Sequence, residues 1–269
     1  MTNLSDLFPA GAGKQVAFTA SGNVSAAGKP VILNTNGTVT QVASSAVSGA
    51  VGSAATYQSS TAFETAATFD SDNNKVVVAF QGPSNYGYGV VGTVSGTSIS
   101  WGTPVVFSST NTARYMAATF DSNTNRVVFA YQDFSNNSYG TAIVGQVSGT
   151  SISYGTPTVF AAENACNDFA ATFDSTNNKV VIAFRDSGNQ GDAIVGTVTG
   201  GGTNSIAFGS ADNYTTGTAQ YQAATFDPDT GQVIIAFGDT SQPNGKVLTA
   251  SVSGTSINCA TPVVFSSNS

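Results

Sequence analysis

The sequence contains no histidine, and this one absence removes several classes of function. Without an imidazole there is no His-ligated metal site, no Ser-His triad and no imidazole general base. The two cysteines, Cys166 and Cys259, are too few for a four-cysteine zinc site or a disulfide framework. They stand at non-equivalent points of the repeat described below. We therefore expect two reduced, mostly buried thiols, with a disulfide between them as the alternative.

Charge is scarce as well. Only 9% of the 269 residues are charged, and 8 Lys and Arg against 15 Asp and Glu give a net charge of −7. Such a chain neutralises few phosphates, so we expect no nucleic-acid partner. The longest apolar runs are about five residues, far below the roughly 20 that a membrane span needs. Residues 1–11 lack the basic and apolar regions of a secretory signal, so none is expected.

What the sequence has in abundance is glycine, 29 residues, and phenylalanine, 17 residues. A hydrophobic content of 41% with so little charge is typical of a folded chain rather than a disordered one. The length allows one or two domains. No composition signal points to a cofactor, and none is expected.

A sequence repeat organises most of the chain. The string AATFD occurs at residues 66–70, 117–121, 170–174 and 223–227, so the repeat is about 52 residues long. Each copy continues with a polar turn, a β-branched run such as KVVVAF, a variable loop, a third run, an SGTS-type turn and a fourth run such as SISWGTPVVF. These features predict four short strands per copy and no helix.

The repeat predicts an all-β fold. A four-stranded antiparallel unit cannot bury both of its faces alone, but units stacked around an axis can. We therefore predict a four-bladed β-propeller with blades at about 56–108, 109–160, 161–214 and 215–269. A β-solenoid and a trimeric fibre are the alternatives. No fourth strand is left over at the N-terminus, so closure is predicted to rest on blade four packing against blade one, unless residues 43–58 add a strand.

Residues 1–55 do not match the repeat and form a predicted N-terminal segment. Residues 1–13 suggest an arm, either disordered or docking, and residues 43–55 a linker. Between them, residues 14–42 suggest short strands with a hairpin at Asn36-Gly37. Isolated hairpins are marginal in water. We expect residues 14–42 to order only against a neighbouring chain or another protein.

The amino-acid sequence of the N-terminal segment resembles that of a known family. LSDLFPAGAGKQVAFTASG at residues 4–22 and GKPVILNTNGTVTQV at residues 28–42 resemble the opening of tail-fibre-type virion proteins of marine cyanobacterial phages. ATFDSNTNRVVFAY and GTAIVGQVSGTSISYGTP are similar to repeats later in such proteins. The resemblance implies a virion component made in the host cytoplasm. It also implies partners through residues 1–42, either copies of the chain or other virion proteins, and contact with a host surface glycan.

One face of the predicted propeller is the better candidate for function. Its loops differ in every copy, whereas the turns of the other face are nearly constant and constrained by turn chemistry. Two residues before each AATFD stand Glu64, Tyr115, Asp168 and Tyr221. In a four-bladed ring Glu64 would face Asp168 and Tyr115 would face Tyr221. This set could bind a cation or a sugar, or resemble a glycosidase pair; the alternative is that all four are ordinary rim residues.

Further candidates surround this set. Arg114 and Arg185 are the basic groups expected on the variable face, where Arg114 would hold an acidic sugar by a paired hydrogen bond. Candidate stacking residues for a sugar are Tyr86, Tyr88, Phe134, Tyr139, Tyr115 and Tyr221. Trp101 and Tyr154 occupy equivalent positions and are predicted to pack. On the constant face, Lys75, Arg126 and Lys179 are predicted to be scaffold or a subunit contact.

The aspartates that end each AATFD admit a calcium interpretation. Asp and Asn are also the residues that cap hairpin turns, which we favour; Asp227-Pro-Asp229 has the best claim to calcium. A sialidase is not supported, because three convergent arginines are missing. The sequence thus predicts a non-enzymatic virion structural protein that displays a propeller. The alternatives are a carbohydrate-binding propeller and, more weakly, a glycan hydrolase using Glu64 and Asp168.

Overall fold

The computed structural model describes residues 19–21, 31–41, 52–109, 112–162, 165–242 and 244–267. The chain divides into two compact units, Met1–Val51 and Gly52–Ser269, with the second beginning slightly before the boundary expected at residue 56. Strands make up nearly all the regular structure that is described, and the short 3₁₀ turn η2 (Pro83–Asn85) is the exception. The described part of the chain has no helix that is long and apolar enough to cross a membrane.

The first unit contains a small hairpin. β1 (Val31–Leu33) pairs antiparallel with β2 (Val39–Gln41). In the turn between them Gly37 has a φ of +77° and donates its N–H to the Asn34 carbonyl oxygen at 3.1 Å. The hairpin predicted at Asn36-Gly37 is confirmed. The arm at residues 1–13 and most of the strand expected from residue 15 lie outside the described residues, and ordering on a partner stays a prediction.

The second unit consists of four antiparallel sheets of five strands each. Sheet 1 holds β3 (Phe63–Asp70), β4 (Lys75–Gln81), β5 (Gly87–Ser95), β6 (Ser98–Trp101) and β7 (Val105–Ser108). Sheet 2 holds β8 (Ala113–Asp121), β9 (Arg126–Asp133), β10 (Tyr139–Ser148), β11 (Ser151–Tyr154) and β12 (Thr158–Ala161). Sheet 3 holds β13 (Asn167–Asp174), β14 (Lys179–Arg185), β15 (Gly191–Thr199), β16 (Ser205–Phe208) and β17 (Asp212–Thr215). Sheet 4 holds β18 (Ala219–Asp227), β19 (Gln232–Asp239), β20 (Asn244–Ser253), β21 (Ser256–Cys259) and β22 (Val263–Ser267).

The fourth strand of each repeat is split into two halves, where the sequence predicted one strand. In sheet 1 both halves, β6 and β7, pair with β5. The break falls at Gly102-Thr103-Pro104, where proline has no N–H to donate to the ladder. A Cβ on Gly102 would lie 1.9 Å from the carbonyl oxygen of Thr150 in the next sheet. Glycine at this position therefore lets the edge of one sheet meet the turn of the next.

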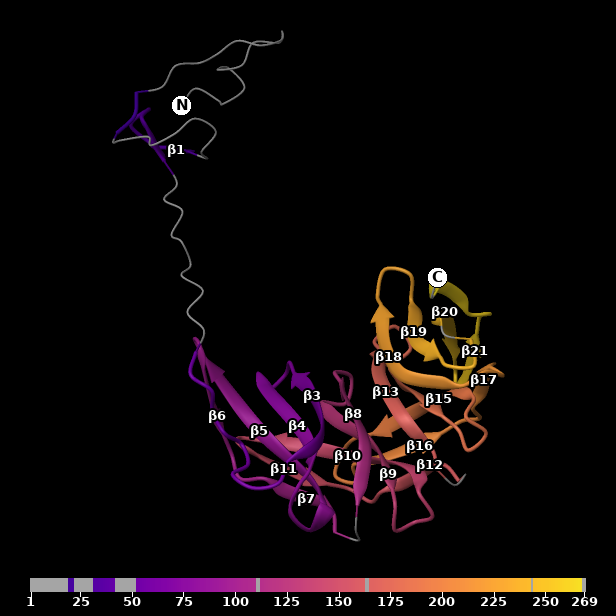
Figure 1. The fold of residues 1–269 in the computed structure, drawn as a ribbon. Coiled ribbons are helices and arrows are strands. Elements are labelled where there is room, and N and C mark those ends of the chain that lie inside the picture. Colours follow the sequence, from indigo (N-terminus) through magenta and orange to yellow (C-terminus); the bar gives the residue numbers. More distant parts are fainter. Residues whose placement is uncertain are drawn as a thin grey trace. The chain divides into compact units, whose positions relative to one another are not determined.

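The four sheets follow one another around a common axis, with β3, β8, β13 and β18 innermost (Figure 1). β3 packs beside β8, β8 beside β13, and β13 beside β18. β18 and β3 have no comparable contact among the described residues, so the sheets form an open arc. The radial, blade-like arrangement is as predicted. The predicted closure of blade four against blade one is wrong, because residues 219–227 end the series without meeting residues 63–70.

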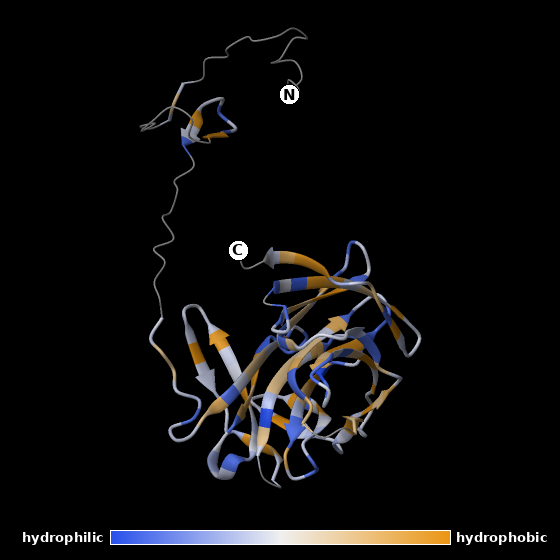
Figure 2. Cartoon of the chain, turned by 45° about the vertical axis from the view of Figure 1, so that its right-hand side comes forward, coloured by the Kyte–Doolittle hydropathy of each residue, from blue (hydrophilic) through white to orange (hydrophobic). Residues whose placement is uncertain are grey.

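Each junction between sheets joins two unlike faces. We call the face toward the next sheet the front face and the opposite one the back face. Val77 and Ala79 on the front of sheet 1 share a core cluster with Val127, Phe129 and Tyr131 on the back of sheet 2. The other two junctions repeat this arrangement. Small front residues thus receive large back residues, which explains the V-x-A and V-x-F spacing of the second strands. Figure 2 shows the strand centres hydrophobic and many of the loops hydrophilic.

Residues 52–57 cover the back of sheet 1, although they form no strand. Their sequence, GSAATY, aligns with GTPVVF at residues 102–107. The Tyr57 ring lies 5.1 Å from Phe80 and 5.5 Å from Trp101, in the manner of Phe107 against sheet 2. The Trp101 indole donates to the Ala55 carbonyl oxygen at 3.1 Å. This segment is a half-copy of an outer strand that the sequence search missed.

The aspartates of AATFD cap turns, as predicted. Asp70 Oδ1 accepts the N–H groups of Asp72 and Asn73 at 3.1 and 2.9 Å, and Oδ2 accepts the Asn73 amide. The same bonds recur at Asp121 and Asp174. At the fourth copy the Thr230 hydroxyl and the Asp229 N–H hold the pKa of Asp227 below its usual value. Because these oxygens already accept hydrogen bonds within the turn, the geometry gives the calcium interpretation no support.

The cations of the constant face serve the scaffold. Lys75 and Lys179 donate to the hydroxyls of Thr93 and Thr197 at 2.8 and 2.9 Å. Arg126 is buried and donates through Nε to Asn204 Oδ1 at 2.6 Å, in the neighbouring sheet. Asn204 follows the glycine insertion of the third repeat, which replaces the SGTS turn. That irregularity therefore supplies a link between sheets 2 and 3.

Neither cysteine forms a disulfide among the described residues, as predicted. Cys166 is buried. Burial and the nearby Asp212 carboxylate raise the pKa of Cys259 to about 12. The Cys259 thiol is therefore not present as a thiolate to any extent at neutral pH.

The Tyr154 ring packs as predicted, but its hydroxyl is buried and makes no hydrogen bond among the described residues. The ring contacts Phe107 and Phe129. We expect Tyr154→Phe to raise the free energy of unfolding by about 1–2 kcal/mol, because it removes an unsatisfied polar group. Urea unfolding followed by circular dichroism measures this. Tyr214→Phe is the matched control and should lower stability, since the Tyr214 hydroxyl donates to Gln222 at 2.6 Å.

Candidate functional site

Every innermost strand carries a β-bulge at the same place. The register of β3 with β4 shifts between Phe63 and Ala66, and the other three innermost strands shift at the equivalent residues. One residue in each bulge has a left-handed backbone: Glu64 (φ 50°), Tyr115 (φ 50°), Asp168 (φ 51°) and Tyr221 (φ 53°). These are the four residues singled out from the sequence. The bulge re-aims each of their side chains out of the regular alternation of the strand.

The left-handed backbone at these positions is unfavourable. Glycine adopts it freely, whereas a bulky residue such as tyrosine in this region is a genuine outlier. Each such residue costs on the order of 1–3 kcal/mol, and residues of this kind gather at functional sites. None of the four copies uses glycine here. The side chains at these positions are thus kept at a cost in stability.

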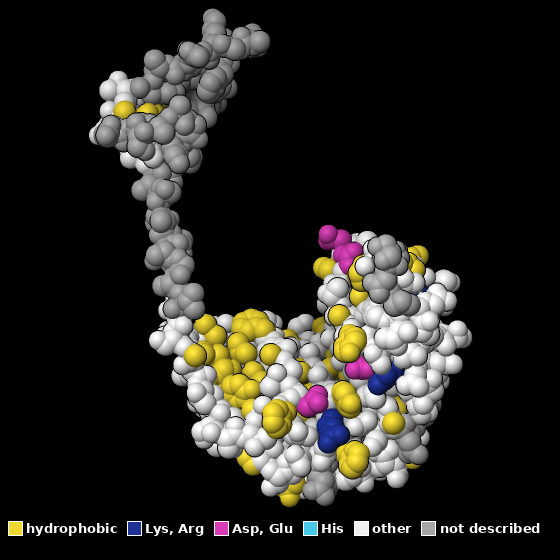
Figure 3. Space-filling model, viewed as in Figure 1, with side chains coloured by type: hydrophobic (Ala, Val, Ile, Leu, Met, Phe, Trp, Pro, Cys, Tyr) yellow, Lys and Arg dark blue, Asp and Glu magenta, His cyan; other side chains and the backbone are white. Residues whose placement is uncertain are grey.

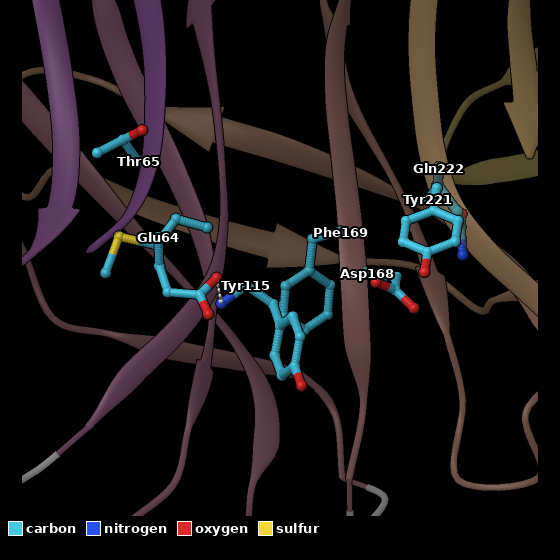
Figure 4. A pocket seen from close by; sticks show the side chains of 8 residues that line it. Glu64, Thr65, Tyr115, Asp168, Phe169, Tyr221 and Gln222 are labelled. Carbon is cyan, nitrogen blue, oxygen red and sulfur yellow. Dashed lines mark hydrogen bonds between the residues drawn. The ribbon is translucent and has the colours of Figure 1, made fainter.

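The four bulge residues line one cavity. With Thr65, Met116, Phe169 and Gln222 they enclose about 180 Å³ at the axis, each innermost strand giving two residues (Figure 4). In Figure 4 the Glu64 and Asp168 carboxylates and both tyrosine hydroxyls point toward the lower side of the view. The sequence thus predicted the convergence of these residues. It did not predict that the cavity is open between β18 and β3.

Glu64 brings an uncompensated negative charge to the cavity. Its Oε2 accepts the backbone N–H of Tyr115 at 3.1 Å, which joins sheets 1 and 2 at the bulge. Its side chain is exposed, and among the described residues no lysine or arginine forms an ion pair with it. Glu64 is therefore available to a cation or to a hydroxyl donor.

Asp168 is partly neutralised by an arginine. Arg185 Nε lies 3.2 Å from Asp168 Oδ2 and also donates to Asn167 Oδ1 at 2.6 Å. Burial raises the pKa of Asp168; the Arg185 guanidinium opposes this rise and the Glu64 carboxylate adds to it. The two carboxylates therefore influence each other across the cavity. A positive or hydrogen-donating ligand between them would relieve that repulsion.

The two tyrosines differ in exposure. Tyr115 is half-buried and packs against the core cluster between sheets 2 and 3. The Tyr221 side chain is 80% exposed. A large aromatic ring that is both strained and exposed gives the fold little, which leaves contact with another molecule as the use for it.

Gln222 adds an unused hydrogen-bond donor that the sequence gave no reason to choose. Its Oε1 accepts the Tyr214 hydroxyl at 2.6 Å, while its buried Nε2 has no partner among the described residues. The equivalent residues are Thr65, Met116 and Phe169, so no shared residue type marks the position. A buried amide donor without a partner costs about 1–3 kcal/mol. Gln222 therefore lines the cavity at a cost in stability.

The other predicted site residues do not line the cavity. The Arg114 guanidinium lies over the Phe134 ring at 5.5 Å, and Arg185 is engaged by Asp168. Tyr88 stacks on Phe80 with ring centroids 5.5 Å apart. Tyr86 and Tyr139 are half-buried at the edges of their loops. The cavity lining includes no basic side chain among the described residues, so the geometry does not favour an acidic sugar held by Arg114.

The strain at Tyr221 can be measured. We expect Tyr221→Gly to raise the free energy of unfolding by about 1 kcal/mol, because glycine removes the cost of the left-handed backbone and little packing is lost. Thermal and urea unfolding of the variant test this. Tyr115→Gly is the control, and its gain should be offset by lost contacts of the half-buried ring. An unchanged or lower stability of Tyr221→Gly would show that the bulge is not strained.

Comparison with known proteins gives matches among solved structures. No family model and no curated protein matches the sequence. Among solved structures, the chain is similar to SapL1 lectin in complex with alpha methyl fucoside, at 15% identity and a TM-score of 0.49 over 76% of this chain. It is also similar to TolB from Acinetobacter baumannii, at 14% identity and a TM-score of 0.41 over 76% of this chain. The matches span 63% of the lectin chain and 44% of the TolB chain.

Proposed function

We propose that the second unit is a non-enzymatic recognition module that binds one sugar unit of a glycan in the axial cavity. The observation that carries this proposal is the set of four equivalent bulges, each holding a strained side chain at the same cavity. Two tyrosine rings and two carboxylates are groups that sugar ring faces and hydroxyls require.

The charges of the cavity favour a neutral or amino-bearing sugar over an acidic one. Glu64 has no cationic partner among the described residues, and Asp168 already holds Arg185. An acidic sugar would bring a third carboxylate toward these two without a free arginine to receive it. An amino group would instead pair with Glu64 and lie against the tyrosine rings.

In the wider proposal the chain is a phage virion structural protein that displays its four sheets as an open, propeller-like arc. Residues 1–42 dock to other virion proteins or to copies of the chain, and the propeller contacts a host surface glycan. The support is the resemblance of residues 4–22 and 28–42 to tail-fibre-type proteins and the cavity on the side of the variable loops.

A glycan hydrolase is the second candidate, favoured by one observation. Burial raises the pKa of Asp168 and the Glu64 carboxylate adds to the rise, and two carboxyl groups whose surroundings shift their pKa values apart are the pattern of a glycosidase. The ion pair with Arg185 weighs against it, because Arg185 stabilises the ionised form of Asp168.

The test is binding and turnover on the same glycans. Full-length protein is applied to an array of neutral, amino-bearing and acidic glycans, and each positive glycan is titrated by calorimetry. We expect saturable binding to neutral or amino-bearing sugars that weakens at least tenfold in Glu64→Gln, with the glycan recovered intact. Binding only to acidic glycans, or none at all, would overturn the proposal. Release of product that Asp168→Asn abolishes would establish the hydrolase instead.

A further inference from the structure

The arc leaves two sheet faces without a neighbour. Three junctions use the front faces of sheets 1, 2 and 3 and the back faces of sheets 2, 3 and 4. The front of sheet 4 and the back of sheet 1 have no neighbouring sheet, although residues 52–57 already cover the outer part of sheet 1, where Phe80 and Val90 are buried. Their inner strands are the two halves of the kind of junction that the chain builds three times within itself.

The alanines of AATFD show the match most directly. At each junction the first alanine of one copy and the second alanine of the next join the same core cluster: Ala66 with Ala118, Ala117 with Ala171, and Ala170 with Ala224. Two alanines are left over, Ala223 on sheet 4 and Ala67 on sheet 1, and both are exposed. They would form the fourth pair.

The residues around the left-over alanines follow the same rule. Phe69 on the back of sheet 1 is 51% exposed, whereas its equivalent Phe120 is 9% exposed. Val94 on β5 is 50% exposed, against 6% for its equivalent Val147. Figure 3 shows hydrophobic side chains gathered over strands β3–β6. The back of sheet 1 thus exposes, on β3 and β5, side chains that the later sheets bury.

The front of sheet 4 is uncovered to the same extent. Ile234 and Ala236 alternate with core residues of β19 and point away from sheet 3. Phe265 is 64% exposed, whereas its equivalent Phe107 is 7% exposed. Because Tyr57 already fills on sheet 1 the place that Phe107 fills on sheet 2, Phe265 lies outside the contact proposed below. Among the residues that alternate toward the two faces, the back of sheet 1 has no charged residue and the front of sheet 4 has one, Asp227 at the turn end of β18. Two largely apolar faces of matching pattern are suited to each other.

We propose that a second copy of this chain docks the back of its sheet 1 on the front of sheet 4, and so continues the series of blade junctions head to tail. The occupant is a second copy because the contact continues an interface that the chain already makes, with the same residue types on both sides. Such a contact joins unlike surfaces. The contact closes into a ring if a whole number of copies completes one full turn. Otherwise it builds an open filament.

The new junction differs from the internal ones at its outer rim. Gly102, Gly155 and Gly209 each lie against the neighbouring sheet, but the fourth repeat has Ala260 at this position. On sheet 1 the same place is already held by Gly52, which lies against Thr97. The docked copy therefore keeps its own residues 52–57 at the rim, and the contact is formed by the inner strands.

Docking would also complete the axial cavity. The cavity is lined by β3, β8, β13 and β18 and is open between the last and the first. A docked copy would place its own β3 next to β18, and with it a further glutamate from the bulge position. The site then has a wall on the side where one copy has none.

The experiment is cysteine cross-linking between two full-length variants, without ligand. Ala67→Cys and Ala223→Cys are prepared separately, mixed, and treated with a short bis-maleimide. We expect a cross-linked dimer in the mixture and only background in either variant alone, because the contact joins unlike surfaces. Val159→Cys mixed with Phe134→Cys is the control; the side chains are 38% and 55% exposed and lie in or next to sheet 2, away from both uncovered faces.

Sedimentation provides the second measurement. We expect the unmodified chain to associate with rising concentration and Ile234→Lys to weaken that association at least tenfold, while Val159→Lys on sheet 2 leaves it unchanged. A chain that stays monomeric at all concentrations overturns the proposal. So does association that Ile234→Lys leaves intact and that gives no mixed cross-link, since it would use another surface such as residues 1–42. Neither outcome depends on whether the cavity binds a sugar.

Discussion

Replacing Gly102 with alanine will lower the free energy of unfolding by about 3 kcal/mol or more. The added Cβ would lie 1.9 Å from the Thr150 carbonyl oxygen, a distance no real contact reaches. The obstacle is backbone rather than the end of a flexible side chain, so sheets 1 and 2 must move apart along their edge. Because their core cluster is shared, this movement also loosens contacts of Phe107 and Phe129.

Urea unfolding measures the loss at Gly102, and two controls separate its causes. Gly188→Ala meets nothing closer than 3.4 Å and should change stability little. Gly96→Ala meets nothing within 4 Å but has a φ of +58°, so it should cost about 1 kcal/mol from backbone strain alone. If Gly102→Ala cost no more than Gly96→Ala, the close approach of the two sheets would not be what holds their edge.

Replacing Tyr115 and Tyr221 together with alanine should reduce glycan binding about 100-fold. Each ring contributes stacking of roughly 0.5–1.5 kcal/mol in addition to the apolar area that it covers. Calorimetry with the glycan found on the array measures the effect, and circular dichroism confirms the fold. Phe134→Ala is the matched control, since its exposed ring lies outside the cavity. Undiminished binding in the folded double variant would place the ligand elsewhere.

The features that the sequence predicted are those that recur. Four copies of AATFD, each followed by a polar turn, fixed the number of sheets and the caps at Asp70 and its equivalents. The convergence of Glu64, Tyr115, Asp168 and Tyr221 followed from their equal distance to the motif. Repetition strengthens such predictions, because a pattern that arose by chance would have to occur in all four copies.

The features that the sequence did not predict depend either on a backbone angle or on a residue type that occurs in only one of the four repeats. Glu64 was selected by position, but nothing in its residue type announces a left-handed bulge, which glycine usually marks. The opening of the arc depends on the small rotation from each sheet to the next, which no residue encodes locally. The role of Gln222 in the cavity escaped because its three equivalents are chemically unlike it.

The bulge has a consequence for how this surface can change over generations. Each repeat presents one side chain to the axis from a backbone that already accepts the cost of the left-handed angle. A single codon in each repeat therefore changes one of the eight residues that line the cavity, while the inner alanines and the capped turns stay as they are. Specificity can change at these four positions without any change in the scaffold that holds them.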